Sequence, residues 1–278
     1  VSSSLNIPKN DFIGVQKAHA ADPWWNSSWT KRVKITFANG SRGALTDFPI
    51  QVALNSGRVT YGDFKASGAD VRCVDADGST LLNYEIEKWD TLGTSTLWVK
   101  IPQIDGSSNT DYVYMYYGNS GASAVATTTG VWDSSYKTVQ HWSEDPAGAA
   151  PQFQDSSSNN IDGTASSTSI GGPVVATTAS GKFGSGLDFN GSTHLVDQGE
   201  TSLGSLPNGS VEFWFDIDSM AAFTNNRYLY SRVKSGANDG ELRVYVDTTS
   251  GSVNRDKIVF QIECTAPSNI NPIATSTA

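Results

Sequence analysis

The chain has 278 residues, enough for two domains of ordinary size, and only 17% of them are charged. Its formal net charge of −9 repels phosphate backbones, which argues against a nucleic-acid partner. Aromatic residues make up 10% of the chain, more than disordered chains usually carry. No apolar run approaches the roughly 18 residues that a membrane helix needs, so we expect no membrane-spanning segment.

Apolar and polar residues alternate along the first half of the chain, as they do in half-buried β-strands. The alternation predicts strands at residues 33–37, 48–54, 71–73, 82–86 and 97–101. The turn residues Asp77 and Gly78 predict that the third and fourth of these form a hairpin. Residues 112–117 are apolar or aromatic on both faces, which predicts a central strand.

The second half follows a small, polar stretch that is typical of a linker. Alternation predicts further strands at residues 139–142, 183–189, 193–196, 211–217, 242–246 and 258–262. From this periodicity we expect a buried second core that contains Trp142, Phe189, Phe213, Phe215 and Phe260.

These patterns predict an all-β protein with two β-sandwich, jelly-roll-like domains in tandem. The expected organisation is an N-terminal extension at 1–22, a first sandwich at 23–119, a linker at 120–136 and a second sandwich at 137–278. Helical periodicity is weak throughout, and a single turn near residues 131–137 is the best candidate for a helix.

A series of motifs runs through residues 23–119. In chain order they are Trp24-Trp25-Asn26-Ser27-Ser28-Trp29, Lys31-Arg32-Val33-Lys34-Ile35, Phe48-Pro49-Ile50, Asp63-Phe64, Ala69-Asp70-Val71-Arg72, Tyr84-Glu85-Ile86-Glu87-Lys88-Trp89-Asp90, Leu97-Trp98-Val99-Lys100-Ile101-Pro102 and Met115-Tyr116-Tyr117-Gly118-Asn119. Together they resemble a bacterial and archaeal domain family of unknown function. That family occurs in exported proteins and is sometimes attached to proton channels of the MotA/TolQ/ExbB type. The resemblance implies an exported protein.

A second series of motifs follows in the other half of the chain. They are His141-Trp142-Ser143-Glu144, Asp155-Ser156-Ser157-Ser158-Asn159, Phe183-Gly184-Ser185-Gly186-Leu187-Asp188-Phe189-Asn190-Gly191 and Val211-Glu212-Phe213-Trp214-Phe215. They resemble a laminin-G-like, concanavalin-type jelly roll. The match stops near Ile262, where such domains usually continue with more strands. Either the chain is a fragment or another segment supplies the missing strands.

Two carboxylates on one face of a strand could serve as nucleophile and acid in a glycosidase, and Glu85 and Glu87 share such a face. Similar acidic strands in jelly-roll glucanases carry a third acid that is missing here, so we interpret the pair as a solvent-facing strand edge. His19, His141 and His194 are too widely spaced to suggest a zinc site or a histidine triad. We therefore expect no catalytic residues and no enzymatic activity.

Oxygen ligands for calcium gather on one loop of the second half. They belong to Asp155, Asn159, Asn160 and Asp162. The laminin-G-like resemblance implies that calcium at a sandwich rim is a possible cofactor. The alternative is a plain hydrophilic loop.

Three tryptophans cluster at the start of the first domain: Trp24, Trp25 and Trp29. Exposed aromatic rings stack on sugars or form interfaces, so these residues are candidates for ligand binding. The alternative is that they plug one end of the sandwich core.

Covalent modification is a separate question. Asn-x-Ser sequons begin at Asn26, Asn39, Asn190 and Asn208. Cys73 and Cys264 form either one disulfide or two buried thiols.

We expect an extracellular, non-enzymatic binding or adhesion protein, secreted or on the cell surface, whose laminin-G-like half holds a glycan or protein. One alternative is a structural subunit of an extracellular filament or sheath, whose partners are other copies of itself. Its strands would be donated by apolar residues of the extension: Leu5, Ile7, Phe12, Ile13 and Val15. Another alternative is an accessory module of a glycoside hydrolase.

Overall fold

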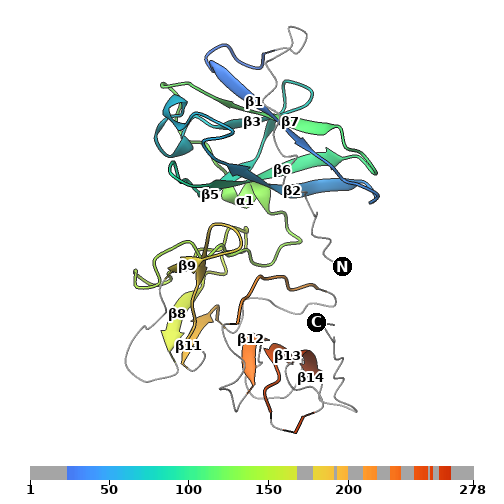
Figure 1. The fold of residues 1–278 in the computed structure, drawn as a ribbon, viewed down its shortest axis with the longest axis vertical. Helices are drawn as coiled ribbons and strands as arrows, with labels where there is room; N and C mark the ends of the chain where they lie inside the picture. Colours follow the sequence, from blue (N-terminus) through green and yellow to red (C-terminus); the bar gives the residue numbers. More distant parts are fainter. Residues whose placement is uncertain are drawn as a thin grey trace. The chain divides into compact units, whose positions relative to one another are not determined.

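The computed structural model describes residues 24–167, 178–190, 193–199, 209–217, 226–232, 241–249, 251–252 and 257–263. The chain divides into two compact units. The first comprises Val1–Phe189 and His194–Asp197, and the second comprises Asn190–Thr193 and Gln198–Ala278. The described strands pair antiparallel, and the described helical elements are single turns (Figure 1). The predicted all-β class is therefore confirmed. No helix in the described part of the chain is long and apolar enough to span a bilayer.

The first unit is built on two sheets that share one core. One sheet has the order β1 (Lys31–Phe37), β7 (Asp111–Tyr117), β3 (Arg72–Asp75), β4 (Leu81–Leu82). The other has the order β2 (Leu45–Leu54), β6 (Ser95–Ile104), β5 (Tyr84–Lys88). Because alternate side chains of a strand point to the same face, each sheet contributes every second residue to the core, among them Ile35, Val52, Leu97, Val99 and Met115.

The hairpin and the central strand of this sandwich are as the sequence predicts. Cys73 pairs with Leu82 across the turn, and Gly78 takes the left-handed φ of +73° that such a turn requires. β7 lies between β1 and β3, with one face in the sandwich core and the other in a second apolar cluster that contains Trp29, which explains why its residues are apolar or aromatic on both faces.

The asparagine of one glycosylation sequon in the first unit is buried in the folded protein. The side chain of Asn39 is 1% exposed, and its Nδ2 donates hydrogen bonds to the backbone oxygens of Gly43 and Asp105, at 2.7 and 3.0 Å. A glycan would replace one of the two hydrogens on this buried nitrogen and break one of these bonds, so its attachment is incompatible with this fold. Asn190 is exposed, whereas Asn208 lies outside the described residues.

The chain after β7 stays with the first unit as far as Phe189. The helical turn α1 (Thr128–Val131) lies in the predicted linker at 120–136 and packs on β5 and β6 (Figure 1). It is followed by the buried Trp132. A loop then leads to an isolated bridge between Phe153 and Gly163. Two short strand pairs complete the unit: β8 (Thr164–Ser167) with β11 (His194–Asp197), and β9 (Thr178–Ser180) with β10 (Ser185–Leu187).

The second unit contains a three-stranded sheet in the order β12 (Arg227–Arg232), β13 (Glu241–Val246), β14 (Ile258–Glu263). Residues 242–246 and 258–262 are thus strands, as predicted. Val244, Val246 and Val259 are buried in it.

The prediction that five aromatic residues are buried in a second core is wrong. Phe189 and Phe215 are exposed, at 36% and 44%, while Trp142, Phe213 and Phe260 are only partly buried. Residues 211–217 form no strand, so their alternating pattern has no paired sheet to bury its apolar side. Trp142 has a φ of +53° in a loop, which breaks the alternation expected at 139–142.

Candidate functional site

The outer face of the β2–β6–β5 sheet carries an ordered set of side chains. Trp98 of β6 is in register with Gln51 of β2 and with Glu85 of β5. The register shifts between Ile86 and Lys88, so Glu87 occupies a β-bulge. Bulges re-aim side chains, and here Glu85 and Glu87 both reach the same histidine, His141.

Glu85 is the hub of this arrangement, which we call the glutamate–histidine cluster: Glu85, Glu87, Trp98, Trp132, His141 and Ser156. Its Oε2 accepts a hydrogen bond from Trp132 Nε1 at 2.8 Å and lies 3.2 Å from His141 Nε2. Its Oε1 accepts a hydrogen bond from Ser156 Oγ at 2.5 Å. Three partners from the segment after β7 therefore converge on one carboxylate of β5.

Glu87 closes the cluster from the other side of the imidazole. Its Oε2 accepts a hydrogen bond from Trp98 Nε1 at 2.7 Å and lies 3.5 Å from His141 Nδ1. The imidazole stacks on Trp98, with centroids 5.9 Å apart, and is tilted against Trp132. With a carboxylate at each ring nitrogen, the geometry favours the doubly protonated imidazolium, in which both nitrogens are donors.

Burial and charge oppose each other in this cluster. Burial by itself lowers the pKa of His141, but the hydrogen bond to Glu85 and the charges of Glu85, Glu87 and Glu144 outweigh it and raise the pKa. Burial also acts against the ionised form of Glu85, yet hydrogen bonds and the charge of His141 lower its pKa. For Glu87, burial dominates and raises the pKa.

These shifts predict a stability that declines in alkali. Because the folded pKa of His141 is raised, its contribution is complete below the ordinary value of about 6.5 and is lost as pH rises through the folded pKa. Urea denaturation of the wild type should therefore give a lower free energy of unfolding at higher pH, with a slope of at most about 1.4 kcal/mol per pH unit for one proton. The slope should be smaller in His141→Gln and unchanged in His194→Gln. Equal slopes in all three proteins would contradict the assignment.

The interpretation of Glu85 and Glu87 as a solvent-facing strand edge is wrong. Glu85 is 4% exposed, and the side chain of Glu87 is 2% exposed. β5 is indeed an edge strand, but its outer face is covered by Trp132, His141 and Ser156. Sequence reasoning considered His141 only as an isolated residue and missed the cluster.

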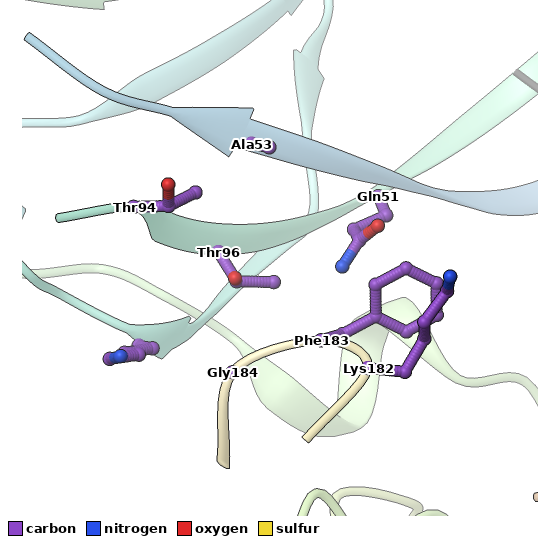
Figure 2. Close-up of a pocket in the computed structure, with 8 residues that line it drawn as sticks. Gln51, Ala53, Thr94, Thr96, Lys182, Phe183 and Gly184 are labelled. Atoms are coloured by element: carbon purple, nitrogen blue, oxygen red, sulfur yellow. The ribbon is translucent and has the colours of Figure 1, made fainter. Parts of the chain in front are cut away.

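A pocket of about 350 Å³ opens beside the cluster on the same face. It is lined by Gln51, Ala53, Lys88, Thr94, Thr96, Lys182, Phe183 and Gly184. Figure 2 shows the ring of Phe183 near Gln51 and the two threonines on the other side. The strands supply one wall, and the loop between β9 and β10 supplies the other.

The three predicted tryptophans meet on the outer face of the opposite sheet. Trp29 is buried and donates from Nε1 to the backbone oxygen of Asp70 at 2.6 Å. Trp25 packs between Trp29 and Tyr116, with centroids 4.9 and 5.7 Å away. Trp24 is 39% exposed. Ligand binding at these rings stays a prediction.

The predicted calcium ligands organise a loop. Asp155 accepts hydrogen bonds from the backbone nitrogens of Val139, Ser157 and Ile161, at 2.8 to 2.9 Å. The remaining predicted ligands contribute differently: Asp162 accepts from the Asp155 nitrogen, Asn159 donates to the Tyr136 oxygen, and Asn160 has a φ of +52°. In the described ranges, no three acidic, histidine or cysteine side chains form a group that could hold a metal. Calcium binding here stays a prediction.

Several predicted residues cannot be placed. Leu5, Ile7, Phe12, Ile13, Val15, His19 and Cys264 lie outside the described residues. Cys73 is a buried thiol outside any disulfide, and burial raises its pKa to about 12.

Comparison with known families gives a match to the model described as Domain of unknown function (DUF2341), over residues 67–165. The resemblance of the first half to a domain family of unknown function is thereby confirmed over part of its length. All six residues of the glutamate–histidine cluster lie in the matched range. No curated protein and no solved structure matches the chain. No comparison supports a laminin-G-like second half.

Proposed function

We propose that this chain is an extracellular, non-enzymatic glycan-binding protein that holds its ligand in the pocket on the outer face of the β2–β6–β5 sheet. The observation that carries the proposal is the composition of that pocket. An aromatic ring, an amide, two hydroxyls and two ammonium groups line one opening: Phe183, Gln51, Thr94, Thr96, Lys88 and Lys182.

This combination suits the chemistry of a sugar. A pyranose has an apolar C–H face that packs on an aromatic ring, and hydroxyls that exchange hydrogen bonds with amides, hydroxyls and ammonium groups. The pocket volume of about 350 Å³ is at the lower end of small-molecule sites, which are roughly 300–1,000 Å³. Lys88, which lines the pocket, is paired with Asp90 at 3.3 Å, and both side chains are about one-third exposed.

The burial and the hydrogen bonds of the two glutamates support a binding function and argue against hydrolysis. A glycosidase places two carboxyl groups on either side of the scissile bond. Here Glu85 and Glu87 are buried and already accept hydrogen bonds from Trp132, Ser156 and Trp98. No substrate can pass between them without removing the covering segment.

The proposed location outside the cell and the laminin-G-like character of the second half rest on the sequence motifs. The 183–191 motif, which carries part of that resemblance, supplies Phe183 and Gly184 to the pocket. A surface role in adhesion is consistent with a glycan ligand. An adhesive role would require no binding site besides the pocket.

Isothermal titration with cellohexaose, chitohexaose, xylohexaose and mannohexaose tests the proposal. We expect at least one to bind, and Phe183→Ala to weaken that binding about tenfold, which corresponds to ~1.4 kcal/mol. Phe189→Ala is the matched control, because Phe189 is an exposed phenylalanine that does not line the pocket. Its affinity should equal that of the wild type.

Two outcomes would overturn the proposal. If the affinity is unchanged in Phe183→Ala but binding is lost in Trp24→Ala, the ligand site lies on the opposite sheet. Release of shorter sugars, detected by mass spectrometry after incubation with pure protein, would make the chain an enzyme.

A further inference from the structure

We infer that ligand binding in the pocket is coupled to proton binding at the glutamate–histidine cluster. This inference rests on the proposed function, since it concerns the regulation of the same pocket. The coupling passes through two residues of the pocket wall, Phe183 and Gly184, which rest directly on members of the cluster.

Gly184 lies against the carboxylate of Glu87. A Cβ at this glycine would lie 2.5 Å from Glu87 Oε1, and the φ of +57° also favours glycine. The backbone of the wall and this carboxylate are therefore in contact with no side chain between them. Any displacement of Glu87 changes the position that Gly184 can occupy.

Phe183 makes the second contact. Its ring meets Trp98 edge to face, with centroids 6.5 Å apart and an interplanar angle of 86°. Trp98 in turn donates to Glu87 at 2.7 Å and stacks on His141. The aromatic ring that lines the pocket is thus one residue away from the imidazole.

The charged groups around His141 come from two segments. Glu85 and Glu87 reach it from β5, and Glu144 acts on it from its own loop. Glu87 is itself influenced by His141, Glu85 and Lys88. When His141 loses its proton, Glu85 and Glu87 lose the cation between them and repel each other.

Of the two glutamates, Glu87 is the one that can move when His141 loses its proton. Glu85 accepts hydrogen bonds from Trp132 and Ser156 in addition to its contact with His141. Glu87 accepts one from Trp98 and sits on a bulge. Deprotonation of His141 therefore shifts Glu87 and with it the wall at Gly184. By thermodynamic reciprocity, a ligand that needs the intact wall raises the proton affinity of the cluster.

A ligand-free experiment tests the contact between wall and cluster. In ¹⁵N-labelled protein, the Gly184 amide and the Trp98 indole should shift with pH at the same midpoint as the His141 ring. The shift of Gly184 should disappear in His141→Gln and in Glu87→Gln, the second variant leaving His141 able to titrate. His194→Gln should behave as the wild type. A Gly184 signal that stays constant while His141 titrates would overturn the coupling.

A second experiment separates this inference from the proposed function. Titration of the hexasaccharides should show binding about fivefold or more weaker near pH 8.5 than near pH 6, on either side of the ordinary histidine pKa. Equal affinity at both pH values, with binding still weakened about tenfold in Phe183→Ala, overturns the coupling but leaves the function standing. If no hexasaccharide binds, the proposed function fails, and the amide titration still decides whether the wall follows the cluster.

Discussion

Replacing Glu85 with alanine is expected to lower the free energy of unfolding by ~3–5 kcal/mol, the range for removing one partner from a buried ion pair. The carboxylate of Glu85 is contacted by donors from three residues, Trp132, His141 and Ser156. Without it, these groups stay buried and lack their acceptor, and the imidazolium of His141 loses its nearest counter-ion. Urea denaturation near pH 6 measures the change while His141 is protonated.

Glu212→Ala is the matched control, since Glu212 is an exposed glutamate of the second unit. Its effect should stay within about 0.5 kcal/mol, as for most surface substitutions. The double variant Glu85→Ala with His141→Gln should be less destabilised than the sum of the two single variants, because each removes the same contact. A loss below ~1 kcal/mol in Glu85→Ala would contradict the buried cluster.

The strands of the first sandwich could be predicted because each one carries its own signal. Along β1, every second residue from Val33 to Phe37 is buried, which is the period that the sequence shows. The Asp77-Gly78 turn is likewise local, since it needs only its own residues to set the hairpin. Strand order between distant segments was not specified by these patterns beyond the central position of β7.

The glutamate–histidine cluster could not be predicted in the same way. Glu85 and Glu87 were placed correctly on one face, but that face is covered by Trp132, His141 and Ser156, which lie in loops far along the chain from β5. Alternation tells which side of a strand an acid occupies and not whether another segment packs there. The two acids of one predicted strand and the tryptophan of the next, Trp98, were the available hint of a buried polar network.

The segment 211–217 shows the opposite failure. Its alternation is as regular as that of β1, yet it forms no strand, and Val211, Trp214 and Phe215 are exposed by 41% or more. A strand is a property of a pair, because its backbone groups are satisfied by a neighbour. The alternating pattern of one segment shows that it is suited to a sheet, but it does not show that a partner strand is present.

The tryptophan cluster leads to the other large expected effect. Trp29→Ala should lower the free energy of unfolding by ~3–5 kcal/mol, the usual cost of truncating a buried aromatic side chain. Trp29 is buried, donates to the Asp70 oxygen, packs on Trp25, and lies under the guanidinium of Arg72 at 5.2 Å. Chemical denaturation of the variant measures the loss.

Trp24→Ala separates a packing role from a binding role at the same cluster. Trp24 is 39% exposed and touches Tyr116 edge to face under the guanidinium of Arg32, so its truncation removes less buried area. We therefore expect a smaller loss of stability than in Trp29→Ala. If Trp29→Ala costs no more than Trp24→Ala, Trp29 is not part of the core. The three rings would then be better understood as one exposed surface for a ligand.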